Sequence, residues 1–333
     1  LIFAGIIRDK RGVRFTAILS GAVMLVGAAI NWYALTDMFA GSALEVWFNI
    51  NLNYIPGFDE LGVSPFYKGM PASAKLSAIG FMIFGCGVEM AGITVSRGIV
   101  KWFKGREMAL AMGSEMALAR LGVATCMIFS PMFAKWGGEI SVSRSVAFGV
   151  VLLMIALIMF IMYAFMDKKL DSQTGEAEEK DDPFKLSDLG KILTDSGFWL
   201  VALLCVLYYS AIFPFQKYAV NMLQCNLVFH QVDPSSIWAS NTITIIQYVI
   251  MLVVAACAFA SNFSKNKVAK YGLMGAAIVA LVVFCYMGYM RQSAETVFAV
   301  FPLLAVGITP ILGNYVDHKG KAATMLVLGS LLL

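Results

Sequence analysis

Two stretches decide the fold of this chain: Gly5-Ile6-Ile7-Arg8-Asp9-Lys10-Arg11-Gly12 near its start and Gly313-Asn314-Tyr315-Val316-Asp317-His318-Lys319-Gly320 near its end. In both copies, two glycines, an aspartate and a basic residue stand at the same offsets, and an apolar stretch follows at once. A glycine at each end of such a motif permits a tight turn. The duplication therefore predicts two related halves, each with a turn between helices.

The composition indicates a membrane protein. Of the 333 residues, 59% are apolar and only 14% are charged, whereas charged residues make up about 25% of soluble domains. The mean hydropathy is +0.77, and the apolar residues form blocks of about 20, the length of a transmembrane helix. Because lipid offers no hydrogen-bond partners to the backbone, these blocks are expected to be helices packed in a bundle. The predicted class is an all-α membrane protein.

The apolar blocks predict a sequence of spans. The tail of one span occupies residues 1–7, and a long loop covers 39–73. Full spans are expected at about 14–38, 74–98, 108–134, 145–166, 197–222, 238–260, 270–290 and 296–315, and a last helix from about Ala322. Lysine and arginine are concentrated in alternate loops, at 8–14, 97–106, 167–191, 265–270 and 317–321. The excess of positive charge places those loops on the cytoplasmic side.

A polar segment divides the chain. Residues 176–182 read Glu-Ala-Glu-Glu-Lys-Asp-Asp, which is too polar to enter a membrane and favours a flexible linker. We therefore expect an N-terminal helical bundle over 1–166, a cytoplasmic linker over 167–195 and a C-terminal bundle over 196–333.

Three ionisable residues stand out away from the ends of the predicted spans: Glu89, Glu115 and Arg120. Such residues cost about 2.5–3.5 kcal/mol each and are candidates for functional sites. Counted as helix, Glu89 lies about 18 Å from Lys101, and Arg120 lies about 21 Å from Arg106 on the next, antiparallel span. Glu89 and Arg120 are thus expected at matching depth near the middle of the membrane.

Two interpretations of this pair stay open. Glu89 and Arg120 could form a buried salt bridge that only locks two helices together. They could instead line a cavity and hold a zwitterionic solute, because Arg presents a fork that suits a carboxylate and Glu supplies the opposite charge. Glu115 points to another face from Arg120 and is either a packing partner or a gate residue.

A second cluster runs from Tyr208 to Lys217. Pro214 interrupts backbone hydrogen bonding in a span and permits a bend. Tyr208 and Tyr209 are expected to line the cavity, with lipid-facing aromatic side chains as the alternative. Lys217 is either part of an outer gate or a side chain that reaches the outer membrane surface.

The duplicated turns suggest a conformational role. Gly5 and Gly313 are expected to allow close helix approach, and Gly12 and Gly320 to allow the turn. Asp9 and Asp317 can accept hydrogen bonds from a helix N-terminus or pair with basic loop residues. Arg11 and Lys319 complete the motif, although their charge also serves to orient the spans.

Cysteine and histidine give no sign of chemistry. The six cysteines stand singly and the two histidines are far apart, so the spacing predicts neither a metal site nor a disulfide framework. No nucleophile or cofactor motif is visible. We expect no catalytic residues and no cofactor.

The duplicated turn resembles the signature loop of the major facilitator superfamily. Three further stretches resemble its lysosomal dipeptide transporter branch: Gly85–Glu89; Trp102–Glu107 with Ala119–Gly122; and Tyr208-Tyr209 with Phe213-Pro214-Phe215. The resemblance covers roughly 74–220. It implies transport by alternating access between two bundles. It also implies that Glu89 holds the amino end and Arg120 the carboxyl end of a dipeptide.

On that family plan the chain is expected to be a fragment, from the end of helix 2 to the start of helix 9. Two extra spans, over about 238–290, then lie between helices 7 and 8. The expected partners are the lipid bilayer and a small dipeptide-like solute. The expected location is the inner membrane of a bacterium, since no lysosomal sorting signal is seen. The alternatives are a proton-coupled facilitator for another small solute (an organic anion, sugar or drug) and a non-transporting membrane scaffold.

Overall fold

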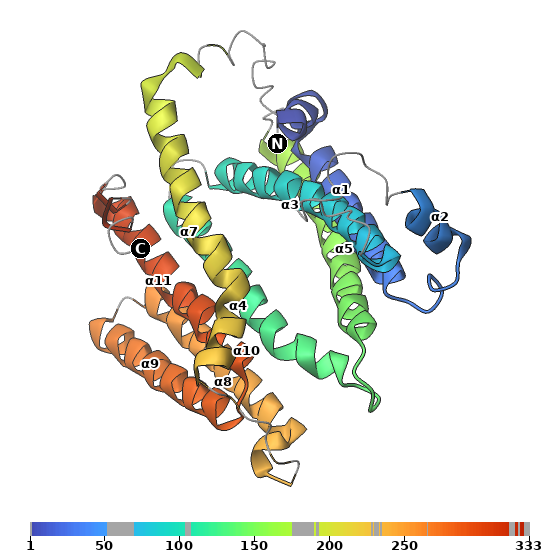
Figure 1. Ribbon diagram of the computed structural model, residues 1–333. Helices are drawn as coiled ribbons and strands as arrows, with labels where there is room; N and C mark the ends of the chain where they lie inside the picture. The colour runs from blue at the N-terminus through green and yellow to red at the C-terminus, as the bar shows by residue number, and fades with distance from the viewer. Residues whose placement is uncertain are drawn as a thin grey trace. The chain divides into compact units, whose positions relative to one another are not determined.

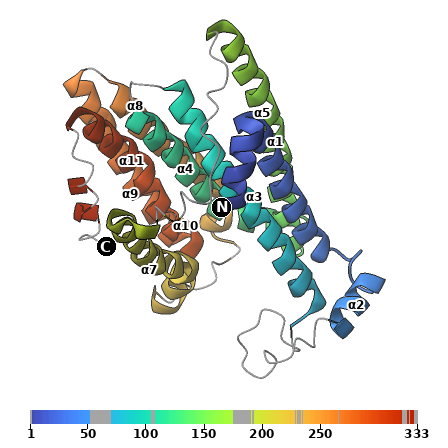
Figure 2. The same ribbon diagram turned by 90° about the horizontal axis from the view of Figure 1, so that it is seen from above.

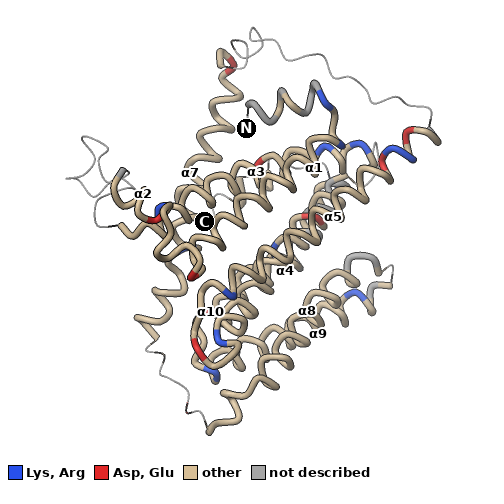
Figure 3. Tube along the Cα trace, turned by 90° about the vertical axis from the view of Figure 1, so that its right-hand side faces the viewer, with Lys and Arg blue, Asp and Glu red and all other residues tan. Residues whose placement is uncertain are grey.

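The computed structural model describes residues 2–51, 70–103, 108–174, 190, 193–227, 229, 233, 235–264, 266–319, 324–325 and 327–329. Over these residues all regular structure is helical. Seven helical segments are long and apolar enough to cross a membrane: Arg11–Ala34, Ala72–Trp102, Leu110–Ala134, Val142–Gln173, Ser196–Leu227, Asn241–Ser261 and Val268–Met290. Most coloured charges in Figure 3 lie near helix ends, with long uncharged stretches between them. The prediction of an all-α, multi-pass membrane protein is confirmed.

The chain forms two compact units, and each is described by itself. Unit 1 consists of residues Leu1–Gly98 and Pro131–Lys185, and unit 2 of Ile99–Ser130 and Leu186–Leu333. The expected division into bundles at 166 and 196 stays a prediction.

Unit 1 contains α1 (Ile2–Ala34), α2 (Ala43–Asn51), α3 (Ala72–Trp102) and α5 (Val142–Thr174). Figures 1 and 2 both show α1 running alongside α5. In this contact Gly21 of α1 lies against the side chains of Leu157 and Phe160. Helix α5 ends at Thr174, so it continues beyond the end expected for this span at 166.

Glycines let α1 and α3 approach to backbone contact. A Cβ atom at Gly27 of α1, or at Gly80 or Gly87 of α3, would lie within 3 Å of backbone atoms of the other helix. Small residues make such close crossings possible in membranes, where packing rather than water drives helix association. Ser77 of α3 also donates a hydrogen bond to Asn31 of α1 (2.5 Å).

Helix α2 was not predicted, since the sequence interpretation treated 39–73 as a loop. Ser42 accepts a hydrogen bond from the backbone N–H of Glu45 (3.2 Å), and the Glu45 carboxylate accepts one from the backbone N–H of Gly41 (2.6 Å). These reciprocal bonds resemble a capping box, in which a serine stands three residues before a glutamate. The Ser42-Ala-Leu-Glu45 pattern was the signal for this helix. Residues 52–69 of the expected loop lie outside the described residues.

Unit 2 contains most of α4 (Met108–Ala134) together with α7 (Ser196–Leu227), the 3-10 turn η1 (Ile237–Ala239), α8 (Asn241–Phe263), α9 (Lys267–Met290), α10 (Ala294–Phe298) and α11 (Val300–Lys319). The side chains of Ser240, Asn266 and Ser293 cap the starts of α8, α9 and α10. A buried cluster joins four helices through Ala124 and Ile128 of α4, Met251 of α8, Phe284 of α9 and Leu303 of α11. The helices expected at 238–260 and 270–290 are present as α8 and α9, and their status as an added pair stays a prediction.

One expected span is assigned as two helices. The apolar block at 296–315 forms α10 and α11, which meet at Ala299, a residue with helical dihedral angles (φ −60°, ψ −16°). The start of the helix expected at Ala322 lies outside the described residues.

Candidate functional site

Glu89 lies on an uncovered face of α3. Its side chain is exposed, and Gly80 and Gly98, which face α1 and α5, lie about 180° around the helix from it. Because α3 is continuous from Ala72 to Trp102, about 18 Å of helix separates Glu89 from Lys101. Among the described residues, Glu89 has no ion-pair or hydrogen-bond partner. The structure thus leaves a carboxylate deep in a span and turned away from the packing of unit 1.

Arg120 lies beside the packed stripe of α4 in unit 2. Ala117 and Ala124 are fully buried against the neighbouring helices, and Arg120 is about 40° of helix rotation from Ala124. The guanidinium is partly buried and, within the described chain, forms no hydrogen bond or ion pair. Glu115 lies about 180° from Ala124, so the two charged residues occupy different faces of α4, as expected.

The pairing of Glu89 with Arg120 stays a prediction, because the two residues belong to different units. The roles proposed for Glu115 also stay open between packing partner and gate. Glu89 in unit 1 and Arg120 in unit 2 each have no ion-pair or hydrogen-bond partner among the described residues of their own unit.

The aromatic cluster of α7 is a ladder along one helix. The rings of Tyr208 and Tyr209 meet edge to face at 5.7 Å, and the ring of Tyr209 stacks on that of Phe213 at 5.2 Å. Tyr208 and Tyr209 are 40% and 52% exposed, so unit 2 covers neither. Helix α7 continues through Pro214. Lys217, one turn later, is exposed.

Sequence reasoning missed the partners of this region of α7. The ring of Phe215 lies 6.0 Å from that of Phe298 and 5.8 Å from that of Phe301, and the latter two rings are stacked. Gln224 of α7 donates a hydrogen bond to Glu295 of α10 (3.3 Å). Residues 298 and 301 are one helical turn apart, but only the fold shows that they meet α7.

The first copy of the duplicated motif forms a kink in α1. Gly12 has φ 82° and ψ 167°, a conformation that is essentially restricted to glycine, so the chain changes direction at this residue, and the conformational role expected of Gly12 stays a prediction. The guanidinium of Arg11 lies over the ring of Phe15, 5.5 Å from its centre. A Cβ atom at Gly5 would meet nothing within 4 Å in the part of unit 1 that the structure describes, so the close helix approach expected there stays a prediction.

Most of the second copy cannot be compared in the same way. The expected roles of Asp9, Gly313, Asp317 and Gly320 fall outside the described residues or side chains. Lys319, the last residue of α11, is exposed.

Comparison with known proteins gives one consistent match. Over 148 residues, or 42% of this chain, the sequence is 28% identical to the protein named lysosomal dipeptide transporter MFSD1 from Gallus gallus, and equally to those from Bos taurus and Homo sapiens. The chain is a distant homologue of MFSD1. The match covers 33% of the Gallus gallus protein and 31% of each of the others, so the chain spans about a third of the relatives it matches. No protein-family model matches the chain, and no solved structure matches it significantly.

In this distant homologue of MFSD1 the structure also reveals an ion-pair cluster that sequence reasoning missed. Arg14 follows the Gly12 kink and donates hydrogen bonds to Asp167 (2.7 Å) and to Asp171 of α5. Asp167 is fully buried and Arg14 is 28% exposed. The two aspartates are four residues apart and therefore lie on one face of α5. Their spacing at the end of a span was the available signal.

A second missed arginine fastens α8 to α9. Arg291 donates hydrogen bonds to the Gln247 side chain (2.8 Å), to Thr244 (2.6 Å) and to the backbone carbonyl of Trp238 (3.3 Å). Gln247 is fully buried and donates to the backbone carbonyl of Phe284. Burial lowers the pKa of the Arg291 guanidinium from its ordinary value. All three acceptors are neutral, so this arginine closes the end of a helix pair without an acidic partner among the described residues.

Proposed function

We propose that this chain is part of a membrane transporter that moves a small zwitterionic solute by alternating access, and that dipeptides are its substrates. The observation that carries the proposal is Glu89, a carboxylate exposed at mid-span on the uncovered face of α3. An ionised group facing lipid at this depth costs about 2.5–3.5 kcal/mol. Such a group is retained where it meets a polar cavity or a ligand.

Arg120 supplies the complementary charge. It is partly buried on α4 and has no partner among the described residues. A guanidinium binds a carboxylate with two parallel hydrogen bonds, while a carboxylate such as Glu89 suits an ammonium group. The separation of the two charged side chains would then select the length of the peptide that can reach both.

Similarity supports the choice of dipeptides over other zwitterions. The relatives matched are named lysosomal dipeptide transporters. The match covers about a third of their length, so the substrate is part of the proposal. The inner membrane of a bacterium stays the predicted location.

Binding to the full-length protein in nanodiscs tests the proposal. Thermal stabilisation and calorimetry would be measured with dipeptides, amino acids and sugars. We expect dipeptides to stabilise the protein, and we expect Arg120→Ala and Glu89→Gln each to weaken binding at least 10-fold. Glu139→Gln is the matched control, because Glu139 is exposed outside the membrane spans.

Modified ligands assign the two ends. A dipeptide amide lacks the carboxylate, so its binding should be insensitive to Arg120→Ala. An N-acetyl dipeptide lacks the ammonium group, so its binding should be insensitive to Glu89→Gln. The substrate assignment fails if no dipeptide binds, or if Arg120→Ala binds dipeptides as well as the parent.

Uptake into proteoliposomes separates the alternatives. A proton-coupled facilitator would take up a different solute, and that uptake would be lost when the proton gradient is dissipated and also in the Glu89→Gln variant. A protein that binds none of the solutes and transports none would be a membrane scaffold of the same fold.

A further inference from the structure

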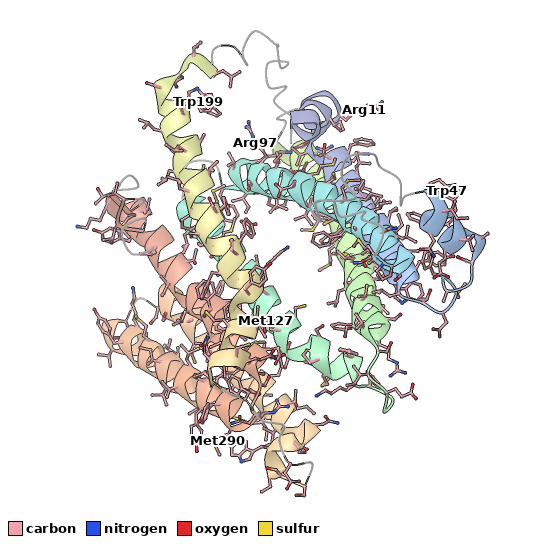
Figure 4. All side chains as sticks on the ribbon, in the orientation of Figure 1. Arg11, Trp47, Arg97, Met127, Trp199 and Met290 are labelled. Atoms are coloured by element: carbon pink, nitrogen blue, oxygen red, sulfur yellow. The ribbon has the colours of Figure 1, made fainter. Side chains whose placement is uncertain are left out.

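Helix α2 presents three different faces to its surroundings. Phe48 is 6% exposed and belongs to a buried cluster with Ala34 and Phe39 and with Ala72 and Leu76 of α3. Glu45 and Asn49 form a polar side of the helix. Val46, Trp47 and Ile50 are 53%, 54% and 59% exposed. This nine-residue helix therefore has one side buried against protein and a separate, exposed apolar side, on which Figure 4 labels Trp47.

The uncovered residues form a continuous stripe. Ala43, Val46, Trp47 and Ile50 follow one another at intervals of i, i+3, i+4 and i+7 and are all exposed, which is the pattern of one helix face. Leu44, 45% exposed, lies between this stripe and Phe48. Glu45 and Asn49 are about 100–200° of helix rotation away from the stripe's centre. We call Val46, Trp47 and Ile50 the α2 stripe.

The packing of Phe48 sets the height of α2 relative to the spans. The span of α1 ends at Ala34, and that of α3 begins at Ala72, and both residues contact the same buried cluster as Phe48. Helix α2 therefore lies at the level where two spans leave the membrane. Tryptophan is enriched at this level because its ring is apolar and its N–H is polar. Trp32 of α1 and Met38, both close to the same end, are also exposed, at 38% and 76%.

We infer that α2 is an interfacial helix whose α2 stripe is embedded among the lipid headgroups and upper acyl chains. Amphipathic helices lie in this plane with the apolar face turned to the acyl chains and the polar side to water. The neighbouring spans also carry exposed apolar side chains, such as Val26 of α1 and Phe81 of α3, which suit contact with lipid. A tryptophan buries about 150–250 Å², so three side chains fall short of the ~800 Å² per partner of a stable protein interface.

Lipid contact has a mechanical consequence. Because Phe48 joins α2 to the ends of both α1 and α3, an anchored α2 holds these two ends at a constant depth in the membrane. The inference rests on membrane insertion and is independent of the proposed substrate.

Fluorescence quenching in proteoliposomes of the full-length protein tests this inference. The difference in emission between the parent and Trp47→Phe isolates the signal of Trp47. We expect that signal to be lost in phosphatidylcholine that carries bromine just below the headgroup. Aqueous iodide should quench it weakly.

The matched control moves the reporter within the helix. In Trp47→Phe/Asn49→Trp the tryptophan occupies the polar side, so iodide should quench it and the brominated lipid should quench it less. All variants would first be checked for an unchanged unfolding temperature in detergent. If iodide quenches Trp47 strongly, the stripe faces water and the inference is wrong. If neither agent quenches it, protein covers the stripe, from a second copy or another partner, and the inference is equally wrong.

Discussion

At the scale of single residues, the environment of each charge separates structural from candidate functional positions. Arg14 is satisfied by Asp167 and Asp171. Glu89 and Arg120 are not satisfied within their own units among the described residues. An ionisable side chain inside a membrane span is costly when it lacks a partner, so these two positions are candidates for a role in binding. Paired charges, in contrast, are expected to affect stability first.

The ion pair of unit 1 gives a first prediction. Asp167→Asn leaves the Arg14 guanidinium with Asp171 as its remaining acidic partner, so we expect a cost below the ~3–5 kcal/mol of stranding a buried charge altogether. We expect a lower unfolding temperature, measured in detergent micelles. Asp171→Asn is the comparison, and its effect should be smaller because Asp171 is 16% exposed. Equal stability of Asp167→Asn and the parent would contradict the structural role.

The duplicated motif gives a second prediction at this scale. Gly12→Ala forces an alanine into φ 82°, ψ 167°, which costs about 1–3 kcal/mol. Gly5→Ala is the matched change in the same motif, where a new Cβ atom meets nothing within 4 Å. Chemical denaturation should show a loss of stability for Gly12→Ala alone. A similar loss for both variants would indicate that the backbone conformation at the kink is not what requires glycine at position 12.

At the scale of elements, small residues determine how closely two helices meet. The α1–α3 crossing depends on Gly27, Gly80 and Gly87. Without water to drive association, such a crossing is stabilised by van der Waals packing over a large area of backbone. Elsewhere, Arg291 at the end of α9 donates two hydrogen bonds to side chains of α8 and one to a backbone carbonyl of η1, all of them neutral groups. These two helix pairs are thus held together by different interactions, close backbone packing in unit 1 and hydrogen bonds in unit 2.

The crossing predicts opposite outcomes for the same substitution at two places. Gly80→Ala must separate α1 from α3 and should cost about 1–3 kcal/mol through overpacking. Gly149→Ala in α5 adds a Cβ atom in open space, so it should stabilise its helix by about 0.5–1 kcal/mol. Unfolding temperatures of the two variants measure the difference. Destabilisation by Gly149→Ala of the same size would show that backbone contact is not what distinguishes Gly80.

At the scale of the whole molecule, the main question is how Glu89 and Arg120 act together. The two lie in different units, and their expected depths match. A pair that only locks helices should tolerate exchange of its charges, whereas a pair that binds the two ends of a substrate should not. Stability and binding therefore respond differently in the two interpretations.

A charge swap distinguishes these interpretations. If Glu89 and Arg120 bind substrate, Glu89→Arg/Arg120→Glu should lose dipeptide binding and should show no recovery of stability over the single variants. Thermal shift and calorimetry on the same preparations give both quantities. The helix lock would be favoured if the double variant recovered the parental unfolding temperature and both single variants bound dipeptides as the parent does.

Part of this fold and site was predictable because a membrane restricts the secondary structure that an apolar segment can adopt. Blocks of about 20 apolar residues must be helices in lipid, and the structure places α3, α4, α8 and α9 close to the predicted ranges. Gly12 was predictable for a similar reason, since its φ is open to glycine and strained for other residues. Helix α2 was missed because nine residues are too short to span, although Ser42 and Glu45 signalled its start.

The sequence alone determined the helical class, the approximate positions of α3, α4, α8 and α9 and the place of Glu89 along its helix, since each depends on local chain length and hydropathy. Only the tertiary structure decided that Arg14 pairs with two aspartates of α5, that Phe215 meets Phe298 and Phe301, and that α2 is buried on the Phe48 side and exposed on the Trp47 side. Those contacts join residues far apart in the chain. Helical periodicity shows which residues share a face, but the face a helix turns to its neighbours is set by packing among all of them.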